Sequence, residues 1–553
     1  MNHFTKRNSF GIWHLAVVFC LLLSALFTVT DAVAQEREHG GAARGRASFR
    51  GDEADINCLK AGELHEMITP EKMPMVRKLY ISGVINVEDM KFIKTLATRT
   101  SAKNDRGRSI ESFLDLNLGS VKLVKNDKYG RGVPLDELPS SLCSSWSRLR
   151  SVVLPRHIRA IGNYAFSSCS HLEMVEMPDH LEAIGDYAFQ SCSQLTEAHI
   201  PQGVSEIGSN AFYGCSKLSD IRLPHLLGVV KKSAFERTAI TFVDIPSSVA
   251  SIEARAFANT KLQEVTIPAG VERLDVSAFS SCLQLAAIHV DNGNSAFSSR
   301  DGLLYDKSQG RLLCCPAGKR GTVSLPASTW RIDNGAFQGC AGLVNVVMGD
   351  GVREIGDNAF RGCSQLSRIQ LPVGLQAIGN DALRECTGLT QVSLPQGLLK
   401  IGTSLFSGCK NLMSVVLPER LEELPERTFK NCERLGTVSL PQGLLAIGRE
   451  AFYECRALMT IAIPPHVSVF GDECFRKCGQ LTTFRFPAVT SLVGNRMLYD
   501  CDALQVVEMP VAIPPQVKHV CDVKGVMLKV PAGSAAAYKK ADGWKKFQRI
   551  MEL

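Results

Sequence analysis

The sequence predicts an α/β repeat solenoid: a right-handed array of about sixteen 23-residue turns with one long parallel sheet and a capping element at each end. Two observations lead to this prediction. From about Leu149 onward, prolines recur every 23 residues, first at 155, 178, 201 and 224, and the frame resumes at 326 and runs to 510. Each period also carries the same string, seen cleanly from Leu172 to Cys192. A unit this short cannot bury its apolar side chains alone, so neighbouring units must stack.

The elements of one unit follow from its string, LxxVxLPxGLxxIGxxAFxxCxx. The LxxVxL segment alternates apolar and polar residues, which predicts a short strand. Proline ends that strand because it has no N–H to donate to a ladder. The IGxxAF segment has apolar residues at three- and four-residue spacings, which predicts an irregular or helical turn, and its nearly constant glycine suggests a conformation that a Cβ would resist. Stacking then aligns one aromatic spine, made of Phe166, Phe189, Phe212, Phe235, Phe257, Phe279, Phe337, Phe360 and Phe452.

Composition along the chain divides it into five segments. Residues 1–34 are typical of a signal peptide: Lys6 and Arg7 precede an apolar run, and an Ala-Val-Ala site ends at Ala34. The alternative for this run is an uncleaved membrane anchor. Residues 35–57 are expected to be a polar linker, 58–139 an N-terminal cap, 140–531 the repeats with an irregular island at 291–319, and 532–553 a C-terminal cap. Ser534 is expected to cap a helix over 535–541, with Trp544 and Phe547 covering the last core layer.

The repeat string resembles the BspA-like, or Treponema pallidum type, class of leucine-rich repeats over about residues 140–531. On this resemblance the solenoid is a leucine-rich-repeat array. The island is similar to a recurrent interruption in that family, with GLLYD and RLLCCP as two short strands around a polar turn. The tail from Val530 is similar to the family's closing element, and Ala61 to Asp115 to its leading cap.

One repeat position holds cysteine in most turns. Metal ligation or a disulfide ladder is one interpretation, and a small buried residue is the other. The second is favoured because Thr238 and Thr260 fill the same position. The redox state of the adjacent Cys314 and Cys315 stays open. The position is occupied by Cys169, Cys192, Cys215, Cys282, Cys340, Cys363, Cys386, Cys409, Cys432, Cys455, Cys478 and Cys501.

Nothing in the sequence indicates catalysis or a bound cofactor. It contains no HExxH, GxSxG or Walker A motif and no Cys/His cluster at metal-ligand spacing, so we expect no enzyme, no cofactor and no metal. The net charge of +7 over 553 residues comes without a basic stripe, so we expect no nucleic-acid partner. We also expect that no transmembrane span remains after signal cleavage. The protein is expected to be a monomer.

The alternating strand positions offer a candidate ligand-binding face, and the alternative is that their charges only solvate the sheet. In the first turns these positions carry charged residues, histidines and one phenylalanine, whereas in the later turns as far as Ala462 they are almost neutral and offer little beyond Arg368 and Gln370. The resemblance implies a secreted or cell-surface protein that adheres to host or bacterial protein ligands, and periplasmic residence stays open. The alternative is a structural or scaffolding envelope protein without a host ligand. The candidate ligand face comprises Glu176, Glu197, His199, Asp220, Arg222, Phe242, Asp244, Glu264 and His289.

Overall fold

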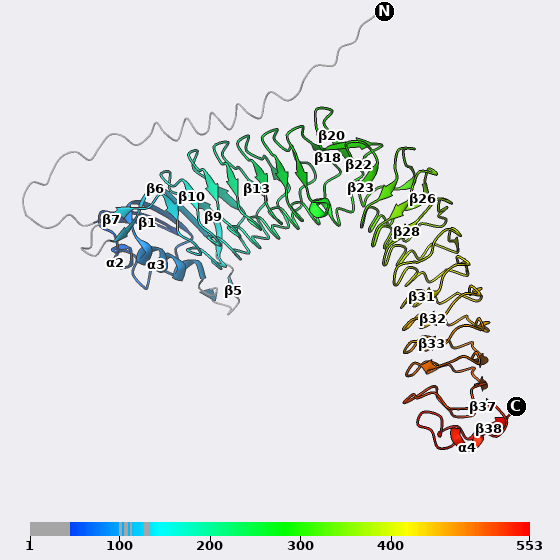
Figure 1. Cartoon of the computed structure of the whole chain (residues 1–553). Helices are drawn as coiled ribbons and strands as arrows, with labels where there is room; N and C mark the ends of the chain where they lie inside the picture. Colours follow the sequence, from blue (N-terminus) through cyan, green and yellow to red (C-terminus); the bar gives the residue numbers. More distant parts are fainter. Residues whose placement is uncertain (1–44, 99–101, 104–108, 111–112, 127–131) are drawn as a thin grey trace, which may run out of the picture. The chain divides into compact units, whose positions relative to one another are not determined.

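Stacked short strands and loops form a parallel β-solenoid of about 21 turns with a repeat of about 23 residues (Figure 1). This computed structural model describes residues 45–98, 102–103, 109–110, 113–126 and 132–553. The expected signal peptide, 1–34, and the first part of the expected linker lie outside these residues. The solenoid predicted from the repeats is confirmed, but its turn count exceeds the expected sixteen. The additional turns come from strands of both end regions, which stack onto the repeat ladder. These strands do not carry the repeat string, so the sequence period does not reveal them.

The first ladder contains the predicted LxxVxL strands, and its solvent side is called the sheet face below. It pairs in parallel with a 23-residue register, for example Val152 with Val175, and it is divided into separate hydrogen-bonded stretches. Its strands are β9 (Leu149–Val153), β11 (Met174–Glu176), β13 (Glu197–Ala198), β15 (Asp220–Ile221), β18 (Glu264–Ile267), β20 (Ala287–Val290), β24 (Gly321–Ser324), β26 (Leu343–Val347), β29 (Gln391–Ser393), β30 (Ser414–Val416), β34 (Thr483–Arg485), β36 (Val506–Glu508), β37 (Met527–Val530) and β38 (Arg549–Glu552).

A second parallel ladder runs beside the first, whereas we expected a single sheet. The two residues before the repeat glycine, such as Ala160 and Ile161, pair with Ala183 and Ile184 of the next turn. Its strands are β8 (Glu137–Leu138), β10 (Ala160–Ile161), β12 (Ala183–Ile184), β14 (Glu206–Ile207), β16 (Val229–Val230), β17 (Ser251–Ile252), β19 (Arg273–Leu274), β25 (Arg331–Ile332), β27 (Glu354–Ile355), β28 (Ala377–Ile378), β31 (Glu423–Leu424), β32 (Ala446–Ile447), β33 (Val469–Phe470) and β35 (Leu492–Val493). Strands of two residues leave no alternating pattern to detect in the sequence.

The Ala-Phe-x-x-Cys segments form a third stack, called the loop ladder below. Its N–H groups donate to the next turn instead of closing a helix: Phe166 N donates to Ala188 O at 2.7 Å. Two residues per loop are left-handed, for example Tyr187 at φ 57° and Ser191 at φ 59°. Of the irregular or helical turn that we expected, these described repeats have the irregular form, and their only helical segment is the 3₁₀ turn η1 (Val276–Phe279).

The repeat glycine is required by close approach of the preceding turn. A Cβ on Gly185 would lie 2.6 Å from Asn163 Oδ1 and 2.7 Å from Asn163 N. On Gly402 it would lie 2.2 Å from the Gly379 carbonyl. Neither glycine has a positive φ. We expected a special backbone conformation at these glycines, and the structure replaces that reason with the spacing between stacked turns.

The N-terminal end is a sheet covered by a helix. β1 (Arg46–Arg50) and β2 (Glu53–Cys58) form an antiparallel hairpin, and β2 then pairs in parallel with β3 (Lys78–Ile85). Residues 46–57 are therefore part of the sheet, whereas we expected a polar linker over 35–57. The stretch Glu53–Cys58 buries Ala54, Ile56 and Cys58 on one side, an alternation that its Gly/Arg-rich surroundings obscure. The remaining elements here are α2 (Leu64–Met67), α3 (Val87–Thr98), β4 (Ala102–Lys103), β5 (Ser109–Ile110), β6 (Leu114–Asn126) and β7 (Gly132–Pro134).

The C-terminal end is closed by aromatic side chains, as expected. Trp544 and Phe547 are buried, and the Trp544 Nε1 donates to Pro515 O at 2.8 Å. The helix α4 (Ala535–Tyr538) is shorter than the expected 535–541. Ser534 does not cap it, because its hydroxyl donates to Pro531 O instead.

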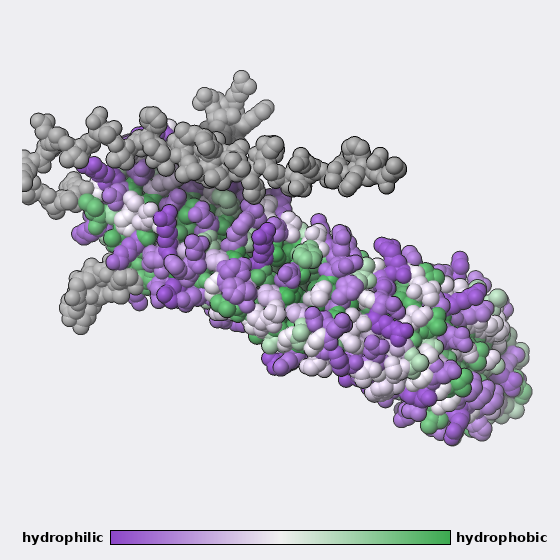
Figure 2. Space-filling model, turned by 90° about the horizontal axis from the view of Figure 1, so that it is seen from above, coloured by the Kyte–Doolittle hydropathy of each residue, from purple (hydrophilic) through white to green (hydrophobic). Residues whose placement is uncertain are grey.

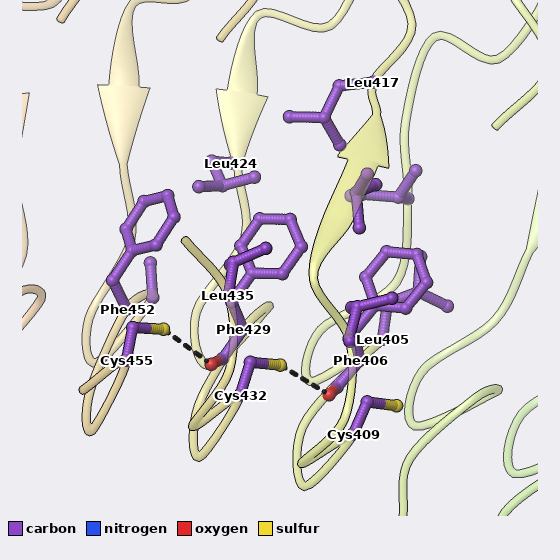
Figure 3. Close-up of a cluster of buried hydrophobic side chains, with 14 of the residues drawn as sticks. Leu405, Phe406, Cys409, Leu417, Leu424, Phe429, Cys432, Leu435, Phe452 and Cys455 are labelled. Atoms are coloured by element: carbon purple, nitrogen blue, oxygen red, sulfur yellow. Dashed lines mark hydrogen bonds between the residues drawn. The ribbon is translucent and has the colours of Figure 1, made fainter. Parts of the chain in front are cut away.

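The core is built from the phenylalanine spine and the cysteine position beside it (Figure 3). Successive rings stack with centroids 4.8–5.9 Å apart, as for Phe337 with Phe360 and Phe257 with Phe279. The repeat cysteines are buried and free, and each thiol donates to a carbonyl of the preceding turn, as Cys432 Sγ does to Phe406 O at 3.2 Å. Burial raises the pKa of the Cys409 thiol to about 12. The prediction of small buried residues is confirmed, and the hydrogen bond adds a reason for choosing cysteine.

The island interrupts this regular stacking. It contains the expected pair of antiparallel strands, β22 (Leu303–Asp306) and β23 (Arg311–Cys314), preceded by β21 (Phe297–Arg300). β23 also pairs in parallel with β25, so it joins the second ladder of the following turns. The buried residues divide into two clusters here, with Leu304 in the N-terminal cluster and Leu303 in the C-terminal one.

Candidate ligand-binding face

All residues of the candidate ligand face are solvent-exposed on the sheet face. Val175, Ala198 and Ile221 point into the core, so the residues on either side of them in the strand point outward. The repeat register aligns these outward residues from one turn to the next. Glu197 is thus the partner of Asp220, and Thr266 the partner of His289.

Four of the predicted residues surround one shallow hollow of about 270 Å³. They are Glu197 and His199 from the turn of β13, and Asp220 and Arg222 from the turn of β15. Its floor is formed by the strands themselves at Ala198 and Ile221. The side chains are carboxylates, an imidazole and a guanidinium, which suits hydrogen bonding to a polar, charged ligand surface.

The other predicted residues lie along the same face outside this hollow. Phe242, two turns along from Glu197, is 70% exposed, which is a large apolar area for a residue on a charged surface. Glu264 Oε2 lies 3.6 Å from His289 Nε2, so these two residues form a pair of their own. Glu176 lies one turn before the hollow, and Asp244 lies in the Phe242 turn.

Sequence analysis missed a larger hollow on the later sheet face. It measures about 1040 Å³ and lies around Arg368 and Gln370, with Asn345, Gln391 and the exposed Val373 also lining it. The segment around Arg368 forms no first-ladder strand, so the first ladder is open there. The sequence signals were Arg368 and Gln370 themselves and Val373, an apolar residue at a position that is polar in the neighbouring turns.

Apolar side chains on the surface are dispersed. On the side of the molecule shown in Figure 2, hydrophobic residues alternate with hydrophilic ones without forming one broad patch. Within the described ranges, no three His, Cys, Asp or Glu side chains gather closely enough to hold a metal ion. No helix among the described residues is long and apolar enough to cross a bilayer.

One known family matches this repeat array. The model of the BspA-type leucine-rich-repeat region matches residues 137–260, 229–301, 319–435 and 400–515, which together are well over half of the chain. The chain belongs to the BspA-type leucine-rich-repeat family. No curated protein matches the sequence of this BspA-type chain.

Solved structures similar to this BspA-type protein come from several bacteria. A leucine-rich cell surface protein from Faecalibacterium prausnitzii is 29% identical with a TM-score of 0.51, and the match covers 59% of this chain and 87% of that one. A leucine-rich-repeat protein of T. pallidum is 34% identical with a TM-score of 0.30, over 31% of this chain and 82% of that one. The pneumococcal vaccine antigen PcpA is 19% identical with a TM-score of 0.41, over 78% and 92%.

Proposed function

We propose that this protein is a secreted or cell-surface binding protein that holds a host or bacterial protein ligand on the candidate ligand face and so serves in adhesion. The observation that carries the proposal is the cluster of charged side chains around the hollow of β13 and β15, one turn from the exposed Phe242. Membership of the BspA-type family and the likeness to a cell surface protein of F. prausnitzii support it.

The charges on the face define the chemistry of the ligand. Five carboxylates and a single guanidinium, that of Arg222, make the face acidic. Arg222 has no salt bridge within the described residues, so one cation is available to a carboxylate of the ligand. Phe242 supplies an apolar anchor of the kind that dominates binding energy when a partner covers it. The expected ligand surface is therefore basic, with an apolar recess for Phe242.

A matched pair of charge variants tests this placement. The variant Glu197→Lys/Asp220→Lys/Asp244→Lys removes the acidic character of the face. The control Asp179→Lys/Glu272→Lys/Glu422→Lys makes the same change in net charge at exposed sites off the face. Ligand captured by the biotinylated mature chain from host matrix and bacterial surface extracts is identified once and then titrated against both variants. We expect the first variant to weaken binding at least about ten-fold and to reverse its dependence on salt, and the control to change neither.

The location and the competing role are tested together. Protease shaving of intact cells should remove the protein, as expected for a surface-exposed chain. If the chain is shaved and no ligand distinguishes the face variant from its control, the solenoid acts as a structural or scaffolding envelope component. If ligand binding depends on Arg368 and Gln370 instead, the binding site lies on the later hollow.

A further inference from the structure

The loop ladder is interrupted once within the repeats, at the island. In a regular turn, four residues separate the last second-ladder residue from the spine phenylalanine, as between Ile184 and Phe189. In the island turn, Leu312 pairs with Ile332, and Cys315 N already donates to Ala336 O at 2.6 Å, the bond that a spine phenylalanine makes elsewhere. Only two residues separate Leu312 from Cys315. The island loop is therefore two residues short and has cysteine in place of phenylalanine.

This short loop leaves a notch between its neighbours. The notch has a volume of about 540 Å³, within the range of about 300–1,000 Å³ typical of ligand sites. Its floor is formed by Leu313, Cys314 and Pro316, one wall by residues 276–283, and the other wall by residues 334–339. The ring stack is interrupted across it, because Phe279 and Phe337 each stack only on the side away from the notch.

The two walls carry backbone groups of opposite hydrogen-bonding character. In the next turn of the loop ladder, Asp357 O and Arg361 O each accept an N–H from the turn before, at 2.8 Å. Within the described chain, the equivalent carbonyls of Asn334 and Gln338 accept no such bond. On the opposite wall, Ser281 N likewise has no acceptor from a following turn. The notch thus presents acceptors on one side and a donor on the other, which is the arrangement that each regular loop satisfies with its backbone.

The wall next to the notch also departs from the repeat sequence. Val276 follows the position of the repeat glycine, where most other turns have polar residues such as Asp186 and Asn334. Leu283 follows the repeat cysteine, where Ser193 stands in a regular turn. Leu283 is 67% exposed and Val276 38% exposed, so neither change serves the core.

A buried polar atom lies in the same wall. Ser280 Oγ is inaccessible and has no hydrogen-bond partner among the described residues. An unpaired buried hydroxyl is destabilising unless something supplies the missing bond. Ser280 lines the notch, so a molecule bound there can supply that bond once the Ser280 side chain rotates its hydroxyl toward it.

We propose that the notch binds an extended peptide segment of a partner protein, with one bulky apolar side chain seated against Val276, Phe279 and Leu283. The peptide backbone takes the place of the missing loop between the acceptors of Asn334 and Gln338 and the donor of Ser281. A peptide fits better than an ion or a sugar, because the walls offer spaced backbone partners and an apolar surface together. The site lies in the loop ladder and does not use the sheet face.

Two probes test the proposal on the full mature chain. One is a synthetic peptide with the sequence of this protein's own regular loop, residues 354–364, and its control carries alanine at the position of Phe360. The other is a random-peptide display library selected on the immobilised chain. We expect saturable binding of the loop peptide, of peptides enriched from the library, or of both, with an aromatic or aliphatic residue required in the bound peptides. The loop peptide with alanine should bind at least about ten-fold more weakly.

The decisive variant is Leu283→Glu, with Leu399→Glu as its control because Leu399 is exposed on a distant turn. We expect Leu283→Glu to weaken peptide binding at least about ten-fold, while Leu399→Glu and the charge variant of the candidate ligand face leave it unchanged. Thermal melting shows that both glutamate variants are folded, and hydrogen exchange should show peptide-dependent protection of residues 276–283 and 334–339.

Three results would overturn the proposal. The first is the absence of saturable binding by either probe up to about 1 mM. The second is peptide binding that Leu283→Glu leaves intact. The third is a change in molecular mass with Leu283→Glu in light scattering without any effect on peptides, which would make a second copy of the chain the occupant.

Discussion

Replacing Cys432 in the middle of the thiol ladder tests the explanation for the most regular feature of the core. Its side chain is fully buried, and its Sγ donates to Phe406 O at 3.2 Å. The next thiol, Cys455, donates in the same way to Phe429 O at 3.2 Å. Burial raises the pKa of the Cys432 thiol well above 9.0, so the group is a neutral donor at pH 7. Cys432→Ala removes both the sulfur volume and this donor.

The expected cost is the sum of three small contributions. Loss of the buried sulfur costs about 1 kcal/mol of transfer free energy. A residual cavity of roughly 25 Å³ costs about 0.6 kcal/mol. Loss of the S–H···O hydrogen bond costs about 0.5 kcal/mol. Cys432→Ala should therefore lower the free energy of unfolding by about 2 kcal/mol.

Cys432→Thr is the matched comparison, because threonine already occupies this position in two turns. Thr238 Oγ1 donates to Phe235 O of its own turn at 2.9 Å. A threonine at 432 has nearly the volume of cysteine and can reach Phe429 O, but it would share that acceptor with Cys455 Sγ. We expect it to cost about 1 kcal/mol, less than alanine does.

The assay is equilibrium urea unfolding, combined with native-state hydrogen exchange of the loop amides, because a long repeat array opens in parts. The exchange data locate the loss of stability in the turns around 432. The reasoning is refuted if the free energy of unfolding of Cys432→Ala lies within about 0.5 kcal/mol of the wild-type value, or if Cys432→Thr lowers it more than Cys432→Ala does.

Two further substitutions have defined outcomes. In urea unfolding, Gly402→Ala should destabilise the protein by about 2–3 kcal/mol, because its Cβ would lie 2.2 Å from the Gly379 carbonyl. The control Gly397→Ala should be close to neutral, because its Cβ would lie 4.0 Å from its nearest neighbour. Equal effects of the two substitutions would contradict the close-approach explanation. For Glu450, burial raises the pKa, but hydrogen bonds from basic neighbours, Lys430 foremost, outweigh it and hold the pKa below 4.5. Its contribution to stability is therefore present above pH 4.5 and is lost as the pH falls through the folded-state pKa. The difference in urea midpoint between wild type and Glu450→Gln should therefore be smaller at acidic pH than at neutral pH. A difference that is the same at both pH values would refute this.

Much of the fold could be predicted from the repeat alone, since a strict period leaves one stacking solution. Phe189 and Cys192 had to be buried, because the same residue types return at the same place in turn after turn. The outward direction of Glu197 and Asp220 followed from strand alternation. The candidate face could thus be named residue by residue, although its role as a binding site stays a proposal.

Tertiary contacts decided what the period does not encode. Residue 402 must be glycine because a Cβ there would lie too close to the Gly379 carbonyl of the preceding turn. The sequence shows only that glycine recurs at this position. The second ladder has strands too short for any pattern, and the end strands β3 and β37 stack as turns without the repeat string. The notch depends on how β23 pairs with β25, since this pairing makes the loop at Cys314 and Cys315 too short. Periodicity in a sequence records contacts that recur in every turn, whereas a contact made once depends on distances that only the folded chain sets.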